Sequence, residues 1–369
     1  MIKRFSVENF RSFKDKIVLD LSKTRDYDFN KNLVVSGIVN KALIYGPNSS
    51  GKSNLGFALM DIASHLTDNN NINNSLNIHL RFPKNIENKK NNIMFEYVFC
   101  FGGKDITYRY EKNAYLALQN EEIIIDNKTM FFYDYLTSRY TNNIEETKTV
   151  NINNRVENIS VIKYIRNNML SFSDDNPIKL IVDFANQMLW FRSLRANEFI
   201  GTNATAEDIS QYIISNNYID DFNDFLKKYS VNEYAVVAET NNGKKIFTQK
   251  GDQSMPFFDA CSTGTASLTL LYYWKKKRFN DIQFLFIDEF DAFYHTKASQ
   301  MILKEINSLA GFQSILTTHN AYLADNSIMR PDCYLILNNN EIKSFSDRTI
   351  KTIREGNNIS KMMLANEFD

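Results

Sequence analysis

The sequence has few residues of the kinds that cross-link a chain or anchor it in a membrane. Cys100, Cys261 and Cys333 are its only cysteines, and they form neither a CxxC pair nor a metal-ligand spacing. This pattern predicts free thiols in a reducing compartment. Net charge is zero, with 43 basic and 43 acidic residues, which excludes a uniformly basic nucleic-acid coat. There is no signal-peptide pattern and no apolar run of the roughly 20 residues that span a bilayer. We therefore expect a cytoplasmic protein that makes no membrane contact.

The predicted fold is an α/β core built from both ends of the chain. Hydrophobic residues make up 43% of the sequence, enough for a sizeable core. Strand and helix patterns predict that residues 1–66 and 255–369 form this core, beginning with an N-terminal antiparallel β subdomain. Residues 67–254 are expected to be a mixed, largely helical insertion. Its expected parts are an asparagine-rich loop (69–74), β hairpins (about 93–133), mainly helices (about 134–230) and a hairpin (about 231–249).

A phosphate-binding loop is the most specific motif. Residues 46–53 fit G-x-x-x-x-G-K-[ST] between an apolar strand and a helix. Glycines let backbone N–H groups turn around a phosphate, and the helix start favours an anion. Lys52 would supply charge to the β- and γ-phosphates, and the Ser53 hydroxyl would ligate Mg²⁺. The predicted nucleotide-binding residues of the loop are Gly46, Pro47, Asn48, Ser49, Ser50, Gly51, Lys52 and Ser53.

Two acidic residues follow an apolar run of buried-strand length at 282–287. In a parallel sheet, the carboxyl ends of strands lie at the rim where ligands bind. We therefore expect Asp288 to hold Mg²⁺, directly or through water, and Glu289 to act as general base toward the attacking water. Taken alone, such a pair is more often a solvated loop. The phosphate loop upstream favours the catalytic interpretation.

Taken in order, the motifs resemble those of ABC-type ATPases of the SMC, RecF and OLD branch. In particular, the sequence is similar to the AAA-type, ABC-like ATPases of bacterial anti-phage and abortive-infection systems, the RloA and AriA kind. The resemblance implies an ABC-ATPase-like core sheet that binds ATP and Mg²⁺. Besides the phosphate loop and the two acids, it rests on residues 7–13, 262–265, 289–295, 317–320 and 354–358.

The resemblance also implies a homodimer, or a higher oligomer, with ATP between the subunits. One subunit's phosphate loop would face the other's signature residues, Ser262, Thr263, Gly264 and Thr265. The alternative for Ser262 is a simple helix N-cap. The family reading of His319 is a catalytic sensor of the γ-phosphate.

Several further assignments stay open. Arg11 either contacts the nucleotide or braces the first turn, and His295 either reaches the partner site or lies in a polar loop. The signature reads Ser-Thr-Gly-Thr rather than Ser-Gly-Gly-Gln, and His295 stands where relatives carry Asp. Gln249 and Gln253 are Q-loop candidates without supporting context. We interpret His65 and His79, which carry no motif, as surface residues.

The function expected from the resemblance is a sensor or regulatory ATPase of an anti-phage system. The segment after Asn320 is too short for a nuclease domain, so we expect a separate effector, such as a nuclease encoded in the same operon. The alternatives are a RecF-like DNA-repair ATPase and a scaffold that uses ATP only to dimerise. For the basic residues 275–278, a solvated helix end is favoured over a DNA contact.

Overall fold

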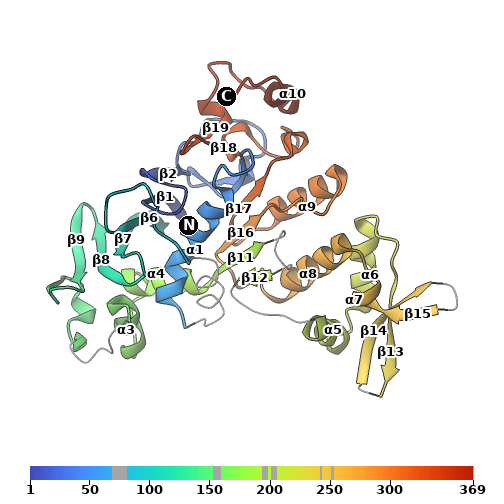
Figure 1. The fold of residues 1–369 in the computed structure, drawn as a ribbon, viewed down its shortest axis with the longest axis horizontal. Helices are drawn as coiled ribbons and strands as arrows, with labels where there is room; N and C mark the ends of the chain where they lie inside the picture. The colour runs from blue at the N-terminus through green and yellow to red at the C-terminus, as the bar shows by residue number, and fades with distance from the viewer. Residues whose placement is uncertain are drawn as a thin grey trace.

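The computed structural model describes residues 1–68, 81–152, 159–192, 198–200, 206–241, 243–250 and 253–368. Two seven-stranded sheets dominate this part of the chain, and a smaller three-stranded sheet lies on a projecting arm (Figure 1). The asparagine-rich run at 69–74 and His79 lie outside the described residues. The predicted α/β class with an N-terminal antiparallel subdomain is confirmed.

The antiparallel sheet joins the N-terminus to strands from the middle of the chain. Its strand order is β10-β9-β8-β7-β6-β1-β2. The hairpin between β6 and β7 turns at Gly102 and Gly103, both at positive φ, as the sequence indicated. The strands are β1 (Ile2–Glu8), β2 (Ile17–Asp20), β6 (Ile93–Phe101), β7 (Lys104–Lys112), β8 (Leu118–Ile125), β9 (Lys128–Asp134) and β10 (Tyr140–Asn142).

The central sheet carries the phosphate loop and the predicted acidic strand. Its order is β12-β11-β16-β17-β5-β18-β19, with β11, β16, β17, β5 and β18 parallel and both edge strands antiparallel. Two strands, β11 and β12, come from the segment expected to be an insertion, and β11 pairs directly with β16. The strands are β5 (Lys41–Tyr45), β11 (Met188–Arg192), β12 (Glu198–Ile200), β16 (Phe284–Asp288), β17 (Gln313–Thr318), β18 (Tyr334–Asn338) and β19 (Glu341–Ser344).

Helix α1 (Lys52–Leu66) is packed between the two large sheets. On one side the Tyr97 hydroxyl of the antiparallel sheet donates to the Ala58 carbonyl at 2.9 Å. On the other side Gly56 lies so close to the central sheet that a Cβ there would be 2.7 Å from the Phe286 ring. Because both sides of α1 are covered, its apolar residues surround the helix instead of forming a single stripe.

A buried polar cluster fixes α1 against the antiparallel sheet. The Lys112 ammonium lies 2.7 Å from the Asp61 carboxylate, and both side chains are almost completely buried. The Tyr110 hydroxyl also donates to Asp61 at 2.8 Å. His65, expected on the surface, instead packs edge-on against Tyr110 and shares a 2.9 Å hydrogen bond with the Tyr108 hydroxyl. The surface interpretation of His65 was wrong because the antiparallel sheet packs against this turn of α1 and leaves His65 only partly exposed.

The Gln313 side chain joins the two large sheets at the start of β17. Its Oε1 accepts from the Ile2 N–H, and its Nε2 donates to the carbonyls of Ile2 and Val39, each at 2.9 Å. Gln313 is 1% exposed, so this amide replaces water for three buried backbone groups.

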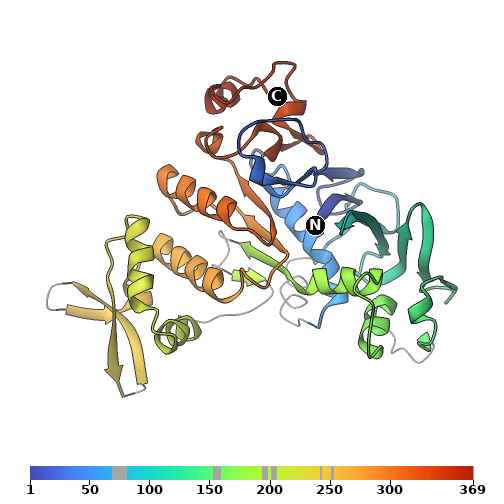
Figure 2. The ribbon, with the colours of Figure 1, turned by 180° about the vertical axis from the view of Figure 1, so that it is seen from behind.

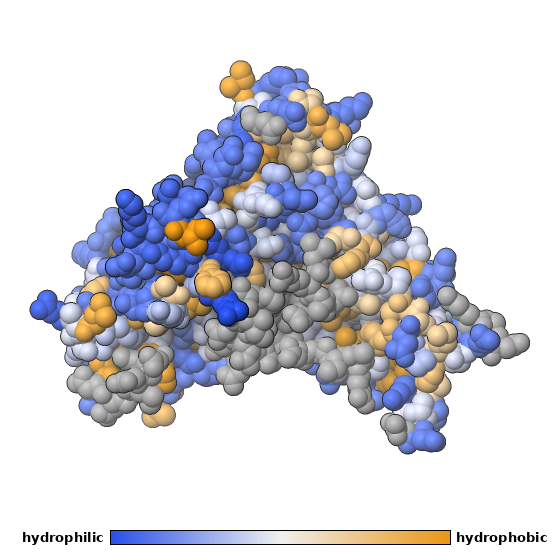
Figure 3. All heavy atoms as spheres, in the orientation of Figure 1, coloured by the Kyte–Doolittle hydropathy of each residue, from blue (hydrophilic) through white to orange (hydrophobic). Residues whose placement is uncertain are grey.

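The projecting arm contains the three-stranded sheet and several helices (Figures 1 and 2). In the view of Figure 3 its surface mixes hydrophobic and hydrophilic atoms, and its exposed apolar side chains include Tyr234 and Met255. The predicted hairpin near residue 242 is present as β13 and β14. The elements are α5 (Ala206–Ser215), α6 (Ile219–Lys228), α7 (Phe257–Ala260), α8 (Thr263–Lys277), β13 (Ala235–Thr240), β14 (Gly243–Lys250) and β15 (Gln253–Pro256).

Acidic partners hold the basic end of α8 to its neighbours. Lys276 pairs with Asp221 of α6 at 3.0 Å, and Lys275 pairs with Glu305. Burial opposes ionisation of Glu305, but hydrogen bonds from Lys228, Lys275 and Tyr229 lower its pKa to about 2. Lys228 and Lys275 therefore tie the arm to the core through Glu305, whereas Lys276 joins two helices of the arm. Further elements are α3 (Val161–Asn168), α4 (Pro177–Asn186), α9 (Thr296–Ser308), α10 (Ile359–Leu364), β3 (Val34–Val35) and β4 (Ile38–Val39).

Candidate functional site

The phosphate loop leaves the carboxyl end of β5 and enters α1. Its backbone is so tightly packed that only glycine fits at both ends. A Cβ on Gly46 would lie 2.5 Å from the Ser50 hydroxyl and 2.7 Å from the Leu337 carbonyl. Gly51 has a φ of 105°, and a Cβ there would be 2.8 Å from the Phe13 ring. The two glycines of the motif are thus required by the fold itself.

The start of α1 is available to an anion. The N-cap residue Gly51 has no side chain, so within the described part of the chain no cap hydrogen bond occupies the first N–H groups of the helix. The Ser50 hydroxyl is buried and has no hydrogen-bond partner among the described residues. A helix start with uncapped donors and an unsatisfied hydroxyl beside it fits a phosphate group.

Lys52 turns back over the loop and reaches the acidic strand. Its side chain is 4% exposed, and its Nζ donates to the carbonyls of Gly46 at 2.8 Å and Pro47 at 3.2 Å. The same Nζ lies 3.3 Å from Oε1 of Glu289. A buried ammonium held by two carbonyls and one carboxylate can bind phosphate oxygens if they replace these partners.

Glu289 connects the phosphate loop to His319. It follows β16 in a left-handed backbone conformation, with φ at 50°, which is costly for a residue with a Cβ. Its Oε2 lies 3.0 Å from Nδ1 of His319, which follows β17 and is 59% exposed on its side chain. Lys52, Glu289 and His319 therefore form one chain of contacts across the ends of three neighbouring parallel strands.

Thr317, a buried residue of β17, belongs to the 317–320 motif, but the sequence predicted no role for its side chain. Its Oγ1 donates to Oδ1 of Asp288 at 2.9 Å and accepts from the Glu289 N–H at 2.8 Å. The only local signal was a threonine two positions before His319. That signal carries no weight until β17 is known to lie beside β16.

The oxygen ligands expected for Mg²⁺ fit a hard cation. Ser53 offers a hydroxyl at the start of α1, and Asp288 offers a carboxylate at the end of β16. Mg²⁺ is bound by one or two protein oxygens together with substrate phosphates and water. The described residues contain no group of three or more His, Cys, Asp and Glu side chains suited to a metal ion.

Two further charged residues, Arg11 and Asp291, lie in the predicted motifs. The Arg11 guanidinium stacks 4.9 Å over the ring of Phe57 in α1, so it braces the first turn against the helix. Asp291 is 7% exposed, and burial raises its pKa. The sequence placed Asp291 in the segment after Glu289 but gave no indication of its burial.

The signature residues begin α8, away from their own phosphate loop. The Ser262 hydroxyl accepts from the Thr265 N–H at 3.2 Å and so caps the helix. A Cβ on Gly264 would lie 2.9 Å from the Phe293 carbonyl, which joins α8 to the segment after Glu289. Among the described residues, no hydrogen bond or ion pair joins residues 262–265 to residues 46–53.

A hollow of about 350 Å³ opens beside the signature. It is lined by the first turn of α8, by residues 293–295 and by the loop at 229–233. His295 is exposed there and shares the hollow with Ser262, Gly264 and Glu233. The structure therefore places His295 with the signature, and it places Gln249 and Gln253 on the three-stranded sheet of the arm.

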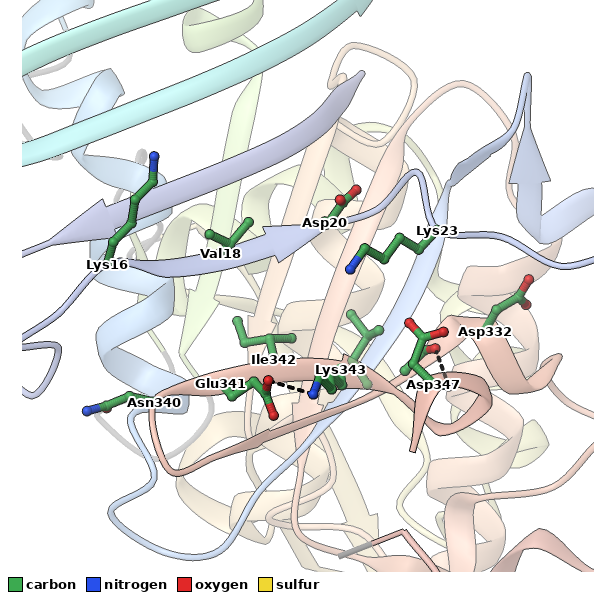
Figure 4. A pocket seen from close by; sticks show the side chains of 12 residues that line it. Lys16, Val18, Asp20, Lys23, Asp332, Asn340, Glu341, Ile342, Lys343 and Asp347 are labelled. Carbon is green, nitrogen blue, oxygen red and sulfur yellow. Dashed lines mark hydrogen bonds and ion pairs between the residues drawn. The ribbon is translucent and has the colours of Figure 1, made fainter. Parts of the chain in front are cut away.

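Another hollow, of about 340 Å³, lies where the edges of the two large sheets face each other (Figure 4). Strand β2 provides Val18 and Asp20, and strand β19 provides the ion pair Glu341–Lys343 at 2.7 Å. Both acidic and basic side chains line this hollow, so its charge favours neither an anionic nor a cationic ligand.

Fold and site together define a phosphate-loop nucleotide-binding domain with acidic residues at the end of the neighbouring strand. The chain matches the family described as "AAA domain, putative AbiEii toxin, Type IV TA system" over residues 41–325, which is most of its length. The chain therefore belongs to this family and is an ATPase of the AAA type. The predicted recognition, an ABC-like AAA ATPase of the abortive-infection kind, is confirmed.

Solved structures similar to the chain include SMC head domains. One, the SmcHead bound to the C-winged helix domain of ScpA, has a TM-score of 0.49 at 14% identity and covers 93% of this chain and 97% of its own. The SMC head domain from Thermotoga maritima has a TM-score of 0.43 at 14% identity, with the same coverage. An Smc head from Pyrococcus furiosus, bound to the C-terminal domain of ScpA, has a TM-score of 0.43 at 13% identity and covers 93% and 95%. No curated protein is significantly similar to the chain.

The described helices include none with both the length and the apolar character to cross a bilayer.

Proposed function

We propose that the protein binds ATP with Mg²⁺ and hydrolyses it. The observation that carries this proposal is the contact chain Lys52–Glu289–His319 at one rim of the central sheet. These residues come from three sequence segments, and their side chains meet where the phosphate loop ends. A site that brings a buried cation, a carboxylate and an imidazole beside uncapped helix donors suits a triphosphate.

In this proposal Lys52 binds the β- and γ-phosphates, and Glu289 accepts a proton from the attacking water. His319, at hydrogen-bond distance from Glu289, orients that carboxylate and senses the γ-phosphate. Ser53 and Asp288 would hold Mg²⁺, which supplies charge neutralisation on the phosphates. Closing the site would exclude water and strengthen each of these interactions.

We further propose that two copies share each nucleotide. The signature residues lie apart from the phosphate loop of their own chain, whereas Ser262 and Gly264 line an open hollow. A second copy could place its γ-phosphate there, with the start of α8 facing the anion. The N-cap hydrogen bond of Ser262 is compatible with this role, because a hydroxyl oxygen has two lone pairs.

For the biological role, we propose a sensor or regulatory ATPase of an anti-phage, abortive-infection system that controls a separate effector such as an operon-encoded nuclease. The family's description, which names a toxin of a toxin–antitoxin system, supports this direction. A RecF-like DNA-repair ATPase is the alternative. Co-purification with the product of a neighbouring gene supports the first role, and stimulation of turnover by DNA ends or gaps supports the second.

Substitution of Glu289 tests the hydrolytic assignment. Glu289→Gln should retain ATP binding and lose turnover by a hundredfold or more, because an amide cannot accept the water's proton. Lys52→Ala should weaken ATP binding, measured by calorimetry, because the charge facing the phosphates is lost. Turnover of Glu289→Gln at the wild-type rate would show that another group is the base.

A further inference from the structure

A single buried hydroxyl contacts both acidic residues at the end of β16. Thr317 is 0% exposed and lies on β17, the strand that neighbours β16 in parallel register. Its Oγ1 is 2.9 Å from the carboxylate oxygen Oδ1 of Asp288 and 2.8 Å from the backbone nitrogen of Glu289. The hydroxyl therefore uses its one hydrogen on Asp288 and a lone pair on Glu289.

The direction of these bonds follows from the chemistry of the groups. A backbone N–H can only donate, so the Thr317 oxygen accepts from Glu289. The hydroxyl hydrogen is then directed to the Asp288 carboxylate, which can only accept while it is ionised. A hydrogen bond to a charged acceptor is stronger than one between neutral groups. The orientation of the Asp288 carboxylate is thus linked to the position of the Glu289 backbone.

The Glu289 backbone needs such support. Its φ of 50° is sparsely populated for a residue with a Cβ, and conformations of this kind persist when neighbours hold them. Thr317 holds this turn twice, because its carbonyl also accepts from the Phe290 N–H at 3.1 Å. The turn directs the Glu289 side chain back toward Lys52 and His319, where both oxygens find partners.

We propose that Thr317 is a positioning residue that sets the Mg²⁺ ligand Asp288 and the general base Glu289 through one hydroxyl group. This inference rests on the proposed ATPase function and deepens it. Through Asp288, the hydroxyl determines how well the metal ion is held. Through Glu289, it determines where the base meets the water. Loss of the hydroxyl therefore weakens metal binding and lowers kcat together, while the phosphate loop still binds ATP.

The test compares Thr317→Val, which removes the hydroxyl at constant shape, with Thr317→Ser, which keeps it. For Thr317→Val we expect kcat to fall on the order of tenfold or more, and the Mg²⁺ concentration for half-maximal turnover to rise by a similar factor. The KM for ATP should stay within about twofold, since Lys52 and the start of α1 are unchanged. Thr317→Ser should restore both quantities.

A matched control separates positioning from stability. Thr147 is also 0% exposed, and its hydroxyl also makes two short contacts, to Asn142 at 3.1 Å and to the Ile144 carbonyl at 2.9 Å, but it lies in the antiparallel subdomain. Thr147→Val should lower the melting temperature without changing the Mg²⁺ dependence. Binding of Mn²⁺ with a non-hydrolysable ATP analogue, followed by electron paramagnetic resonance, gives a readout that needs no turnover. There Thr317→Val should bind Mn²⁺ about tenfold more weakly, and Thr317→Ser as wild type.

The outcomes distinguish this inference from the proposed function. If the wild type binds no ATP, the proposed function fails and the role of Thr317 fails with it. If the wild type is active and Thr317→Val matches it in kcat and in metal affinity, only the positioning role is overturned. A Thr317→Ser variant as impaired as Thr317→Val would also overturn it, because the methyl group and not the hydroxyl would then matter.

Discussion

The Lys52 ammonium and the Glu289 carboxylate form a buried ion pair, with Nζ 3.3 Å from Oε1. In the proposed mechanism of ATP hydrolysis each group has a different partner. Lys52 would bind a phosphate, and Glu289 would bind the attacking water. A phosphate bound by Lys52 would therefore compete with Glu289 for the ammonium group. Displacement of Glu289 from Lys52 would also free its carboxylate to act as a base. Binding of the phosphate and activation of the base would therefore be linked.

This competition predicts that Glu289→Gln tightens nucleotide binding in a single subunit. The amide is a weaker partner for Lys52 and does not repel the phosphates, so affinity for ADP and ATP should rise several-fold, about 1 kcal/mol. The measurement is calorimetry in a Ser262→Arg background, where trapping of ATP between subunits cannot contribute. The exposed Glu145→Gln serves as control, and equal affinities with and without Glu289 would contradict the competition.

A shared site predicts complementation between two inactive variants. Ser262→Arg should abolish turnover but leave ATP binding to the phosphate loop intact. Lys52→Ala should lose ATP binding but keep the signature. Mixed heterodimers contain one complete composite site, so ATPase activity should reappear on mixing. If verified heterodimers remain inactive, Ser262 is only the cap of α8.

The buried lysine at the start of β5 predicts an unusual dependence of stability on pH. Lys41 is 1% exposed, and burial lowers its pKa from 10.5 to about 7. Between these values the unfolded chain binds more protons than the folded protein. The contribution of Lys41 to the free energy of unfolding therefore rises as pH increases from about 7 to 10.5, and it is at its lowest below pH 7.

Lys41→Met removes the free-energy cost of burying a charged ammonium group and also loses the hydrogen bond from Nζ to the Phe312 carbonyl. We expect the net effect to be a gain of roughly 1–3 kcal/mol in the free energy of unfolding at pH 6. The gain should shrink toward pH 10. Denaturant unfolding at a series of pH values measures it, with the exposed Lys128→Met as control. A gain of the same size at pH 6 and pH 10 would show that titration of Lys41 plays no part.

The ion pair between Asp61 and Lys112 predicts a large loss of stability when one member is removed. Lys112→Met leaves the Asp61 carboxylate buried without its counter-charge, which costs about 3–5 kcal/mol. Adding Asp61→Asn should recover part of the loss, because the amide oxygen still accepts from Tyr110 and carries no charge. Urea unfolding of the single and double variants measures both effects. A Lys112→Met variant as stable as the wild type would contradict a stabilising role for this ion pair.

The sequence predicted those parts of the site that lie within a short, continuous motif. The phosphate loop, the apolar strand before Asp288 and the short strand before His319 each carry their own pattern, and the structure brings their side chains together. Thr317 could not be found, because its role depends on the register between β16 and β17. The pairing of Lys52 with Glu289 was equally hidden, since it joins residues far apart in the chain.

Strand β11 shows the same limit at the level of the fold. The sequence pattern predicts that its residues, Met188 to Arg192, belong to a mainly helical segment. A short apolar run has no periodicity that separates a buried strand from a turn of buried helix. Only its pairing with β16 identifies it as a member of the central sheet. Strands β11 and β12, from the middle of the sequence, thus complete a sheet whose remaining five strands lie toward the two ends.

The amide of Gln313 has a mechanical consequence. It begins β17, the strand that ends just before His319, and it holds the first strand of the antiparallel sheet by hydrogen bonds to both backbone groups of Ile2. Helix α1, wedged between the same sheets, couples them a second time. A displacement of His319 along β17 would thus be transmitted through Gln313 to the N-terminal strand β1. The two large sheets should therefore move as one rigid block. If two copies share each nucleotide, as proposed, the motion that brings a signature to the partner's phosphate should occur between this block and the arm.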